Sequence, residues 1–214
     1  MVSSLGNVEV EYFDIYGRAD PIRLLLAYSG VAFKNVVVQQ PDWPALKADT
    51  ARYPHGGLPM VTVDGMRMGQ TMSILRNFGL RLGHYPAEDA ELAWNCDSVM
   101  DIWNSTMDAN GGFVFAPEDK KEEAQAKLTA ALTQMFDIVT ERMRTNKWKY
   151  CAGNKITCAD FCIFTYYCNM VTNKMSPLTA IYEPFYNAPE LEHIKKDLGA
   201  KLADYLESRD KRPM

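Results

Sequence analysis

Hydrophobic and polar positions alternate in short runs over the first eighty or so residues, and the period of the alternation changes repeatedly. Residues 8–13 have a period of two, which predicts a β-strand. The two faces of this strand carry Val8, Val10 and Tyr12 on one side and Glu9, Glu11 and Phe13 on the other. Residues 19–29 have helical spacing instead, and Asp20-Pro21 suits a first helical turn. The chain therefore begins with a strand followed by a helix.

The same change from strand to helix recurs further along the chain. We expect strands at 33–38, 59–63 and 66–69, a helix at 71–82, and at 41–51 a loop that has room for a helix. Asp64-Gly65, between two apolar runs, is typical of a two-residue hairpin. These segments predict a small mixed sheet with helices on its faces, an α/β domain over residues 1–83.

Beyond the breaker-rich residues 83–86 the pattern becomes helical only. The expected helices cover 90–110, ending at Gly111-Gly112, then 118–144, a third that begins near 157, and shorter ones from about 177 and over 190–206. Thr157 and Asp160 have the spacing of a capping box, so we interpret Asp160 as structural. The second domain is expected to be all-helical and to cover residues 88–214.

Composition and charge exclude several classes of protein. The 214 residues are 47% hydrophobic and 23% charged, and the net charge of −4 shows no basic stripe for nucleic acid. Residues 1–6 lack the pattern of a leader, and no apolar run is long enough to cross a membrane. Five cysteines without a CxxC and three dispersed histidines favour neither a disulfide framework nor a metal site. A cytoplasmic protein without metal is expected.

Tyr12 is the first candidate for chemistry. It ends the first strand, and a turn through Gly17 then leads into a helix. This order can leave a phenol facing a cleft, beside helix N-terminal amides and an arginine, Arg18. By residue type alone a packed aromatic is the commoner interpretation of such a tyrosine, so its neighbours decide.

Two further segments suit the binding of a peptide-like ligand. Leu58-Pro59 stands at the entry to a strand, where a cis bond would leave the Leu58 backbone free to pair with an extended ligand. Gln70-Thr71 begins a helix whose unpaired amides favour a carboxylate.

Together these segments resemble the cytosolic glutathione transferases, most closely the sigma class, which includes haematopoietic prostaglandin D synthases; the mu and pi classes are near relatives. The residues that carry the resemblance are Tyr12-Phe13, Gly17-Arg18-Ala19, Trp43 with Lys47, Leu58-Pro59, Gln70-Thr71, and Thr157 with Asp160. The resemblance implies a thioredoxin-like N-terminal domain, a helical C-terminal domain, a homodimer and a role in detoxification. It also implies glutathione as co-substrate and a small hydrophobic electrophile as its partner.

Matched position by position, Tyr12 corresponds to the catalytic tyrosine that donates a hydrogen bond to the glutathione sulfur. The glutathione-binding positions correspond to Arg18, Trp43, Lys47, Gly57, Leu58, Gln70 and Thr71. Three departures stand out. Thr71 replaces a usual serine, and Gly57 replaces a lysine or glutamine. The acidic residue that these families lend across the dimer falls on Asn104 or Ser105, so this role stays unassigned, with Asp101 and Asp108 as alternatives.

The pocket for the electrophile is harder to predict. Candidate lining residues are Phe13, Tyr16, Trp103, Met107 and Phe113, each of which suits the core or a dimer interface equally well. Three functions remain open on the sequence: conjugation of glutathione to electrophiles, glutathione-dependent isomerisation of a prostaglandin-type endoperoxide, and non-catalytic binding of hydrophobic ligands or a structural role.

Overall fold

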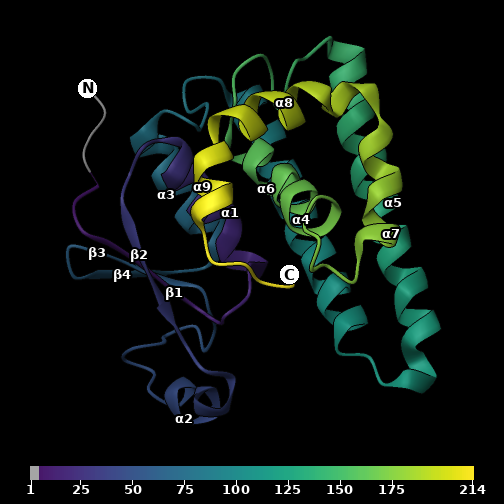
Figure 1. Ribbon diagram of the computed structural model, residues 1–214. Helices are drawn as coiled ribbons and strands as arrows, with labels where there is room; N and C mark the ends of the chain where they lie inside the picture. Colours follow the sequence, from purple (N-terminus) through teal and green to yellow (C-terminus); the bar gives the residue numbers. More distant parts are fainter. Residues whose placement is uncertain (1–4) are drawn as a thin grey trace.

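A four-stranded mixed sheet forms the N-terminal part of the computed structural model, which describes residues 5–214 (Figure 1). Met1–Ser4, part of both the segment considered for a leader and the expected first domain, lie outside the described residues. The strands are β1 (Val8–Tyr12), β2 (Phe33–Val37), β3 (Met60–Val63) and β4 (Met66–Gly69), in the order β2-β1-β3-β4. β1 is parallel to β2 and antiparallel to β3, and β3 is antiparallel to β4. The predicted mixed sheet is confirmed.

Helices lie on both sides of this sheet. α1 (Asp20–Tyr28), which follows a 3-10 turn at Gly17–Ala19, packs beside α3 (Thr71–Leu82) over one face (Figure 1). The short α2 (Trp43–Lys47) follows a 3-10 turn at Gln40–Asp42 and lies away from them. This order of strands and helices is the thioredoxin-like fold expected from the resemblance.

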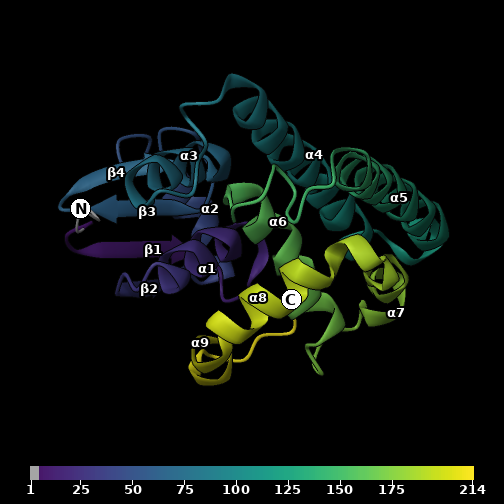
Figure 2. The same ribbon diagram turned by 90° about the horizontal axis from the view of Figure 1, so that it is seen from above.

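The rest of the chain is helical. Its helices are α4 (Ala90–Val114), α5 (Lys121–Asn146), α6 (Cys158–Tyr166), α7 (Thr179–Tyr182), α8 (Glu192–Lys201) and α9 (Ala203–Ser208). α4 and α5 form a long antiparallel pair, and α6 lies between that pair and α1 (Figure 2). Every residue of α6 is buried, so this helix joins the two parts of the molecule in one core.

The capping box at the start of α6 is present. Asp160 accepts the backbone N–H of Thr157 at 2.8 Å, and its other carboxylate oxygen accepts the backbone N–H of Cys151 at 2.8 Å. The first bond satisfies an amide at the buried start of α6, and the second ties the helix to the segment before it. The structural interpretation of Asp160 is confirmed.

Two of the expected helices differ from the structure, one in its end and one in its continuity. α4 does not stop at Gly111-Gly112 but continues to Val114. Lys121 stabilises this last turn, because its Nζ donates to the carbonyl oxygens of Phe113 and Val114 at 2.9 and 3.3 Å. That cap offsets the cost of about 1 kcal/mol for each helical glycine. The helix expected over 190–206 is divided at the buried Leu202, whose φ of −98° and ψ of 3° separate α8 from α9.

Candidate functional site

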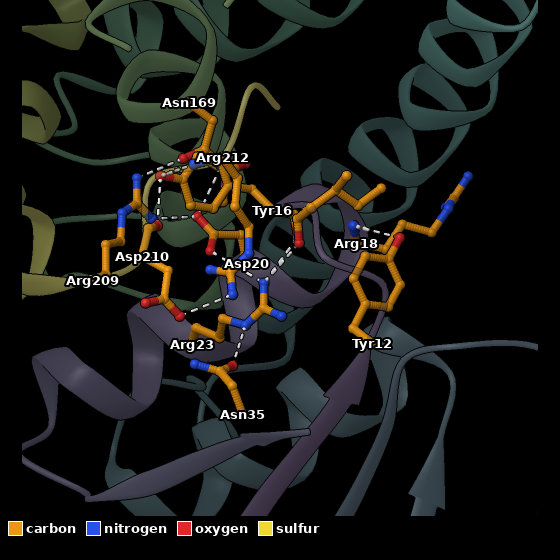
Figure 3. A network of polar contacts seen from close by, with 12 residues as sticks. Tyr12, Tyr16, Arg18, Asp20, Arg23, Asn35, Asn169, Arg209, Asp210 and Arg212 are labelled. Carbon is orange, nitrogen blue, oxygen red and sulfur yellow. Dashed lines mark hydrogen bonds and ion pairs between the residues drawn. The ribbon is translucent and has the colours of Figure 1, made fainter. Parts of the chain in front are cut away.

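The Tyr12 phenol lies at the end of β1 and is only 7% exposed. Its hydroxyl oxygen accepts the backbone N–H of Arg18 at 3.1 Å (Figure 3). Within residues 5–214 the hydroxyl donates its own hydrogen to no other group. A phenol held in this way has its acceptor side occupied by the chain and its donor side available for a ligand.

Ionisation of Tyr12 is disfavoured in this setting. Burial raises the pKa of the phenol, and the Arg18 amide with the charges of Arg18 and Arg23 lowers it by less. Because the net shift is upward from a value near 10, Tyr12 is protonated at neutral pH. The protonated hydroxyl is therefore able to donate a hydrogen bond.

A buried polar network fixes the loop that follows Tyr12. Arg23 donates to the carbonyl oxygens of Ile15 and Tyr16, each at 3.2 Å, and to the side chain of Asn35 at 2.8 Å. The neighbouring Asp20 is fully buried. It accepts bonds from Asn169 and Arg209 at 2.8 and 2.9 Å, which joins α1 to the helical part of the chain (Figure 3). The loop beside the phenol is thus held from both parts of the molecule.

The expected glutathione residues of α2 and the following loop lie in one row that leads away from Tyr12. The rings of Tyr12 and Phe13 have centroids 5.6 Å apart, and Phe13 meets Trp43 edge-on at 5.7 Å. Lys47 lies against the next loop, since its Cε is 3.3 Å from where a Cβ on Gly56 would stand. Gly57 and Leu58 follow Gly56 directly in the sequence. The structure therefore brings these predicted residues to the same side of the sheet end.

Leu58-Pro59 lies beside the end of β1. The antiparallel register pairs Glu11 with Met60, so the two residues before Met60 continue alongside Tyr12 and Phe13, beyond the last paired position. The peptide bond between Leu58 and Pro59 is cis.

Gln70 and Thr71 stand at the start of α3, next to Arg18. The Thr71 hydroxyl donates to the Arg18 carbonyl oxygen at 3.2 Å, which ties α3 to the loop after β1. Gln70 has a φ of +71°, a conformation that non-glycine residues adopt rarely and often at functional sites. The first amides of α3 have no intrahelical partner, so this end of the helix suits a carboxylate.

The Arg18 side chain points across to α4. Its guanidinium contacts the side-chain oxygen of Asn104 and forms an ion pair with Asp108 at 2.7 Å. Asp101 pairs with Arg76 at 3.3 Å instead. Of the positions considered for the acidic contact, Asn104 and Asp108 therefore lie beside Arg18 of the same chain.

A cavity of about 190 Å³ opens at the Tyr12 hydroxyl, between the loop after β1 and α4. Arg18 also lines it, and Met107 is the predicted pocket residue on its wall. Phe13 packs between Tyr12 and Trp43, Tyr16 lies under Arg209, and Trp103 is fully buried. Phe113 packs under the ammonium group of Lys121. These four residues do not line the cavity.

Sequence reasoning missed most of the cavity wall. Asn110, Gly111 and Val114 follow Met107 at helical spacing on α4, and Ile15 and Met170 come from segments far apart in the sequence. The spacing 107, 110, 111 and 114 was the available signal, because residues at i, i+3, i+4 and i+7 share one face of a helix. That signal was hidden by the expectation that the helix ended at Gly111.

Known proteins match the chain along most of its length. Residues 102–176 match the family model "Glutathione S-transferase, C-terminal domain". "Glutathione S-transferase P 1" of Xenopus laevis is 29% identical over 95% of this chain and 94% of its own length. "Hematopoietic prostaglandin D synthase" of Homo sapiens is 26% identical over 73% of this chain and 76% of its own length.

Solved structures agree with these matches. The sigma class glutathione transferase of Fasciola hepatica superimposes with a TM-score of 0.76 at 25% identity, covering 98% of this chain and all of that one. The fold, the family model and the relatives are consistent with one another. The chain is thus similar to glutathione S-transferases over most of its length.

Within residues 5–214, neither a membrane-spanning helix nor a metal-binding group is present. No helix within residues 5–214 combines the length and the apolar character that a bilayer crossing needs. In the same part of the chain, no group of three or more His, Cys, Asp or Glu side chains is placed to hold a metal ion.

Proposed function

We propose that the protein is a glutathione transferase that joins the thiolate of glutathione to a compact hydrophobic electrophile. The observation that carries this proposal is the Tyr12 hydroxyl, which accepts the Arg18 amide and has its hydrogen free at a cavity. A sulfur atom bound there receives a hydrogen bond from a protonated phenol. The bound peptide is then the nucleophile, and the protein supplies ionisation and proximity.

The energy required is within the reach of this contact. A free cysteine thiol has a pKa of about 8.5, so only a few per cent is thiolate at neutral pH. Lowering that pKa by about two units takes about 2.7 kcal/mol of preferential stabilisation of the anion. A hydrogen bond to a charged group contributes about 1.5–3 kcal/mol. The Tyr12 hydroxyl can supply most of this energy, and the bond that it accepts from the Arg18 amide strengthens it as a donor.

The predicted residues on the two sides of Tyr12 define where the rest of glutathione binds. In this proposal the Leu58 backbone pairs with the cysteinyl unit, and the amides at Gln70-Thr71 take the γ-glutamyl carboxylate. Trp43 and Lys47, with the backbone of Gly57, hold the other end of the tripeptide. Support comes from the arrangement, since these residues lie on both sides of the Tyr12 phenol.

The finer assignments are also proposals. We place the protein in the sigma class, as a cytoplasmic homodimer with a role in detoxification, with domains at 1–83 and 88–214. The sigma class neighbour, which this chain covers in full, supports the class. Met66, Leu80 and Trp94 on β4, α3 and α4 are large exposed apolar side chains, and a homodimer that covered them would remove apolar surface from water.

Conjugation fits the cavity better than isomerisation of a prostaglandin-type endoperoxide. Pockets for drug-sized ligands span roughly 300–1,000 Å³, whereas the cavity at Tyr12 is about 190 Å³. Its size suits a compact electrophile. Product analysis separates the two reactions, because only conjugation consumes glutathione.

The test is a conjugation assay with chlorodinitrobenzene on the purified protein and on Tyr12→Phe. We expect Tyr12→Phe to keep glutathione affinity and to lose most turnover. Tyr28→Phe is the matched control, since Tyr28 lies on α1 away from the cavity and packs against His84 and Phe161. Wild-type turnover by the Tyr12 variant would remove the proposed role of the phenol. Glutathione binding without turnover in the wild type would favour the non-catalytic function.

A further inference from the structure

The segment after α9, residues 209–214, lies between the helical part of the molecule and the loop after β1 (Figure 3). We call this segment the strap. Two of its side chains, Arg209 and Arg212, are buried, with 7% and 4% of their surfaces exposed. Arginine is almost never fully buried unless it is paired. The strap is therefore part of the packed structure, and its contacts on the two sides show what it holds.

On one side the strap is anchored to the helical part of the chain. Arg209 donates to the side-chain oxygen of Asn169 at 2.8 Å. The carbonyl oxygen of Arg212 accepts a bond from the Asn173 side chain at 2.9 Å. Asn169 lies in the π-helical turn Tyr167–Val171 that follows α6, and Asn173 lies just beyond it. Both ends of the strap are thus fixed to the same buried helical segment.

On the other side the strap holds Tyr16, which is only 2% exposed. The Tyr16 hydroxyl donates to the Asp210 carbonyl oxygen at 3.2 Å and accepts the Arg212 backbone N–H at 3.3 Å (Figure 3). The backbone N–H of Tyr16 donates to the Met214 carbonyl oxygen. The Arg209 guanidinium carbon lies 4.1 Å from the centroid of the Tyr16 ring. The strap therefore holds this residue by its hydroxyl, its ring and its backbone.

Tyr16 stands directly before the two residues that orient the Tyr12 phenol. Gly17 turns the chain with a φ of +42°, and the backbone N–H of Arg18 donates to the Tyr12 hydroxyl at 3.1 Å. Peptide groups are planar, so only two soft dihedral angles per residue separate the Tyr16 and Arg18 amides. A displacement of Tyr16 is therefore passed on to the amide that the phenol accepts.

We propose that Tyr16 is a positioning residue through which the strap holds the Arg18 amide on the Tyr12 hydroxyl. This inference rests on the proposed function, because it takes that hydroxyl as the donor to the glutathione sulfur. The Arg18 bond occupies the acceptor side of the phenol, which aims its hydrogen toward the ligand and strengthens it as a donor. Release of the strap weakens the donation to the sulfur, so the pKa of the bound thiol rises.

The test measures the pKa of the glutathione thiol bound to the protein, by thiolate absorbance, in three variants. Tyr16→Phe removes the hydroxyl and keeps the ring. The second variant lacks residues 210–214, and the third combines the two changes. No electrophile is present in this measurement, so the loss of Met214 from the cavity wall does not enter it. Arg23 still donates to the Tyr16 carbonyl oxygen at 3.2 Å, so the variants loosen the loop without freeing it.

We expect the bound thiol pKa to rise by about one unit, tenfold in its ionisation constant, in the variant that lacks residues 210–214. Tyr16→Phe keeps the ring and backbone contacts, so it should show a smaller rise. The double variant should show the same rise as the shortened chain alone, because both changes release the same residue. The glutathione dissociation constant at pH 6.5 should change by no more than about 2-fold, since the thiol form binds equally well.

A pH profile of turnover separates positioning from a loss of folded protein. With chlorodinitrobenzene, kcat of Tyr16→Phe should be reduced at pH 6.5 and approach the wild-type value at pH 8.5, about two units above the lowered thiol pKa, where the thiol is ionised in both proteins. A loss of folded protein would be the same at both pH values. The charges that act on Tyr12 are those of Arg18 and Arg23, and arginine keeps its charge in proteins, so the profile reports the thiol.

Tyr150→Phe is the matched control. Its hydroxyl is also part of a largely buried residue and joins distant segments, since it donates to Asp197 on α8 at 2.6 Å. We expect this variant to leave the bound thiol pKa unchanged.

An unchanged thiol pKa in both Tyr16→Phe and the shortened chain would overturn the inference. So would a rise in the double variant equal to the sum of the single rises, a loss of turnover that does not depend on pH, or an equal rise in Tyr150→Phe. If the shortened chain does not fold, Tyr16→Phe with its pH profile decides alone. The proposed function fails separately, when the wild type itself leaves the bound thiol at the free pKa of about 8.5.

Discussion

Gly17 and Tyr12 are packed so closely that a Cβ atom on residue 17 would lie 2.8 Å from the phenolic oxygen. Gly17 also has a φ of +42°, in the region that favours glycine. The glycine therefore does two things at once. It turns the chain so that the Arg18 amide reaches the Tyr12 hydroxyl, and it leaves the space in which that hydroxyl lies.

Substitution of this glycine should reduce activity through Tyr12. In Gly17→Ala the new methyl group displaces the phenol or the loop, and we expect kcat for conjugation to fall about 10-fold or more, since small misplacements of catalytic groups are costly. Gly30→Ala is the matched control, because Gly30 has a φ of +70° but open space around its Cβ position. Gly30→Ala should lose about 1–2 kcal/mol of unfolding free energy, and Gly17→Ala at least as much, because its methyl group also meets the phenol. A Gly30 variant as inactive as the Gly17 variant would contradict this account.

Gly111 should control the size of the electrophile pocket. It lines the cavity, and a Cβ at this position meets no atom within 4 Å, so the side chain of Gly111→Val starts in open space and narrows the cavity. We expect KM for the electrophile to rise about 10-fold with little change in glutathione affinity. Gly112→Val, at a position with equal space that does not line this cavity, should leave both constants almost unchanged. Steady-state kinetics with each substrate varied in turn distinguishes these outcomes.

The buried carboxylate of Glu11 should make stability depend on pH in acid. Burial opposes its ionisation, but bonds from Tyr53 and Arg67 and the charge of Arg52 outweigh burial and lower the pKa. A lowered pKa in the folded state gives stability that is present above the unfolded pKa, near 4.3, and is lost as pH falls through the folded value. Glu11→Gln should therefore lower the free energy of unfolding at pH 7 and flatten its decline below about pH 4.5.

Urea unfolding over a range of pH measures this effect. Glu9→Gln is a suitable control, since Glu9 lies on the same strand and pairs with Lys34 at the surface. An identical pH dependence in wild type and Glu11→Gln would show that Glu11 does not carry the effect.

Asp20 should be a major contributor to stability. It is fully buried with Arg209 at 2.9 Å and Arg23 at 3.7 Å, so its removal leaves buried cations without their partner. We expect Asp20→Asn to lower the free energy of unfolding by about 3–5 kcal/mol, the usual cost of breaking a buried ion pair. Asp14→Asn removes an exposed carboxylate from Arg212 and should cost less than about 1 kcal/mol. Similar losses in the two variants would contradict the assigned role of Asp20.

Local signals in the sequence predicted most of the fold. The alternation over 8–13, the Asp64-Gly65 hairpin and the box at Thr157 and Asp160 each depend on residues close in sequence, and the structure shows all three. The end of α4 was wrong because a glycine pair reads as a helix stop. Lys121, seven residues beyond the helix, provides the cap, and its geometry is set only when α5 folds back.

The residues of the candidate site also fall into two groups, those that short motifs predict and those that depend on distant contacts. Tyr12, Arg18 and Thr71 were predicted from short motifs, and the structure brings them together through bonds of 3.1 and 3.2 Å. Asn110 was not predicted to line the cavity, because its position is fixed by a bond from Tyr182, which is 72 residues away in the sequence. Sequence patterns name the elements that form a cavity, but contacts between distant segments decide which side chains face it.

The most direct test of the central claim is the pKa of the glutathione thiol when bound to the protein, measured by the ultraviolet absorbance of the thiolate across a pH titration. Tyr12 is a protonated donor, so the wild type should hold the bound thiol about two units below the free value of about 8.5. In Tyr12→Phe the pKa should return to near 8.5 while the glutathione dissociation constant changes by no more than about 3-fold. A bound thiol with the same lowered pKa in both proteins would contradict the claim that the Tyr12 hydroxyl holds the thiolate.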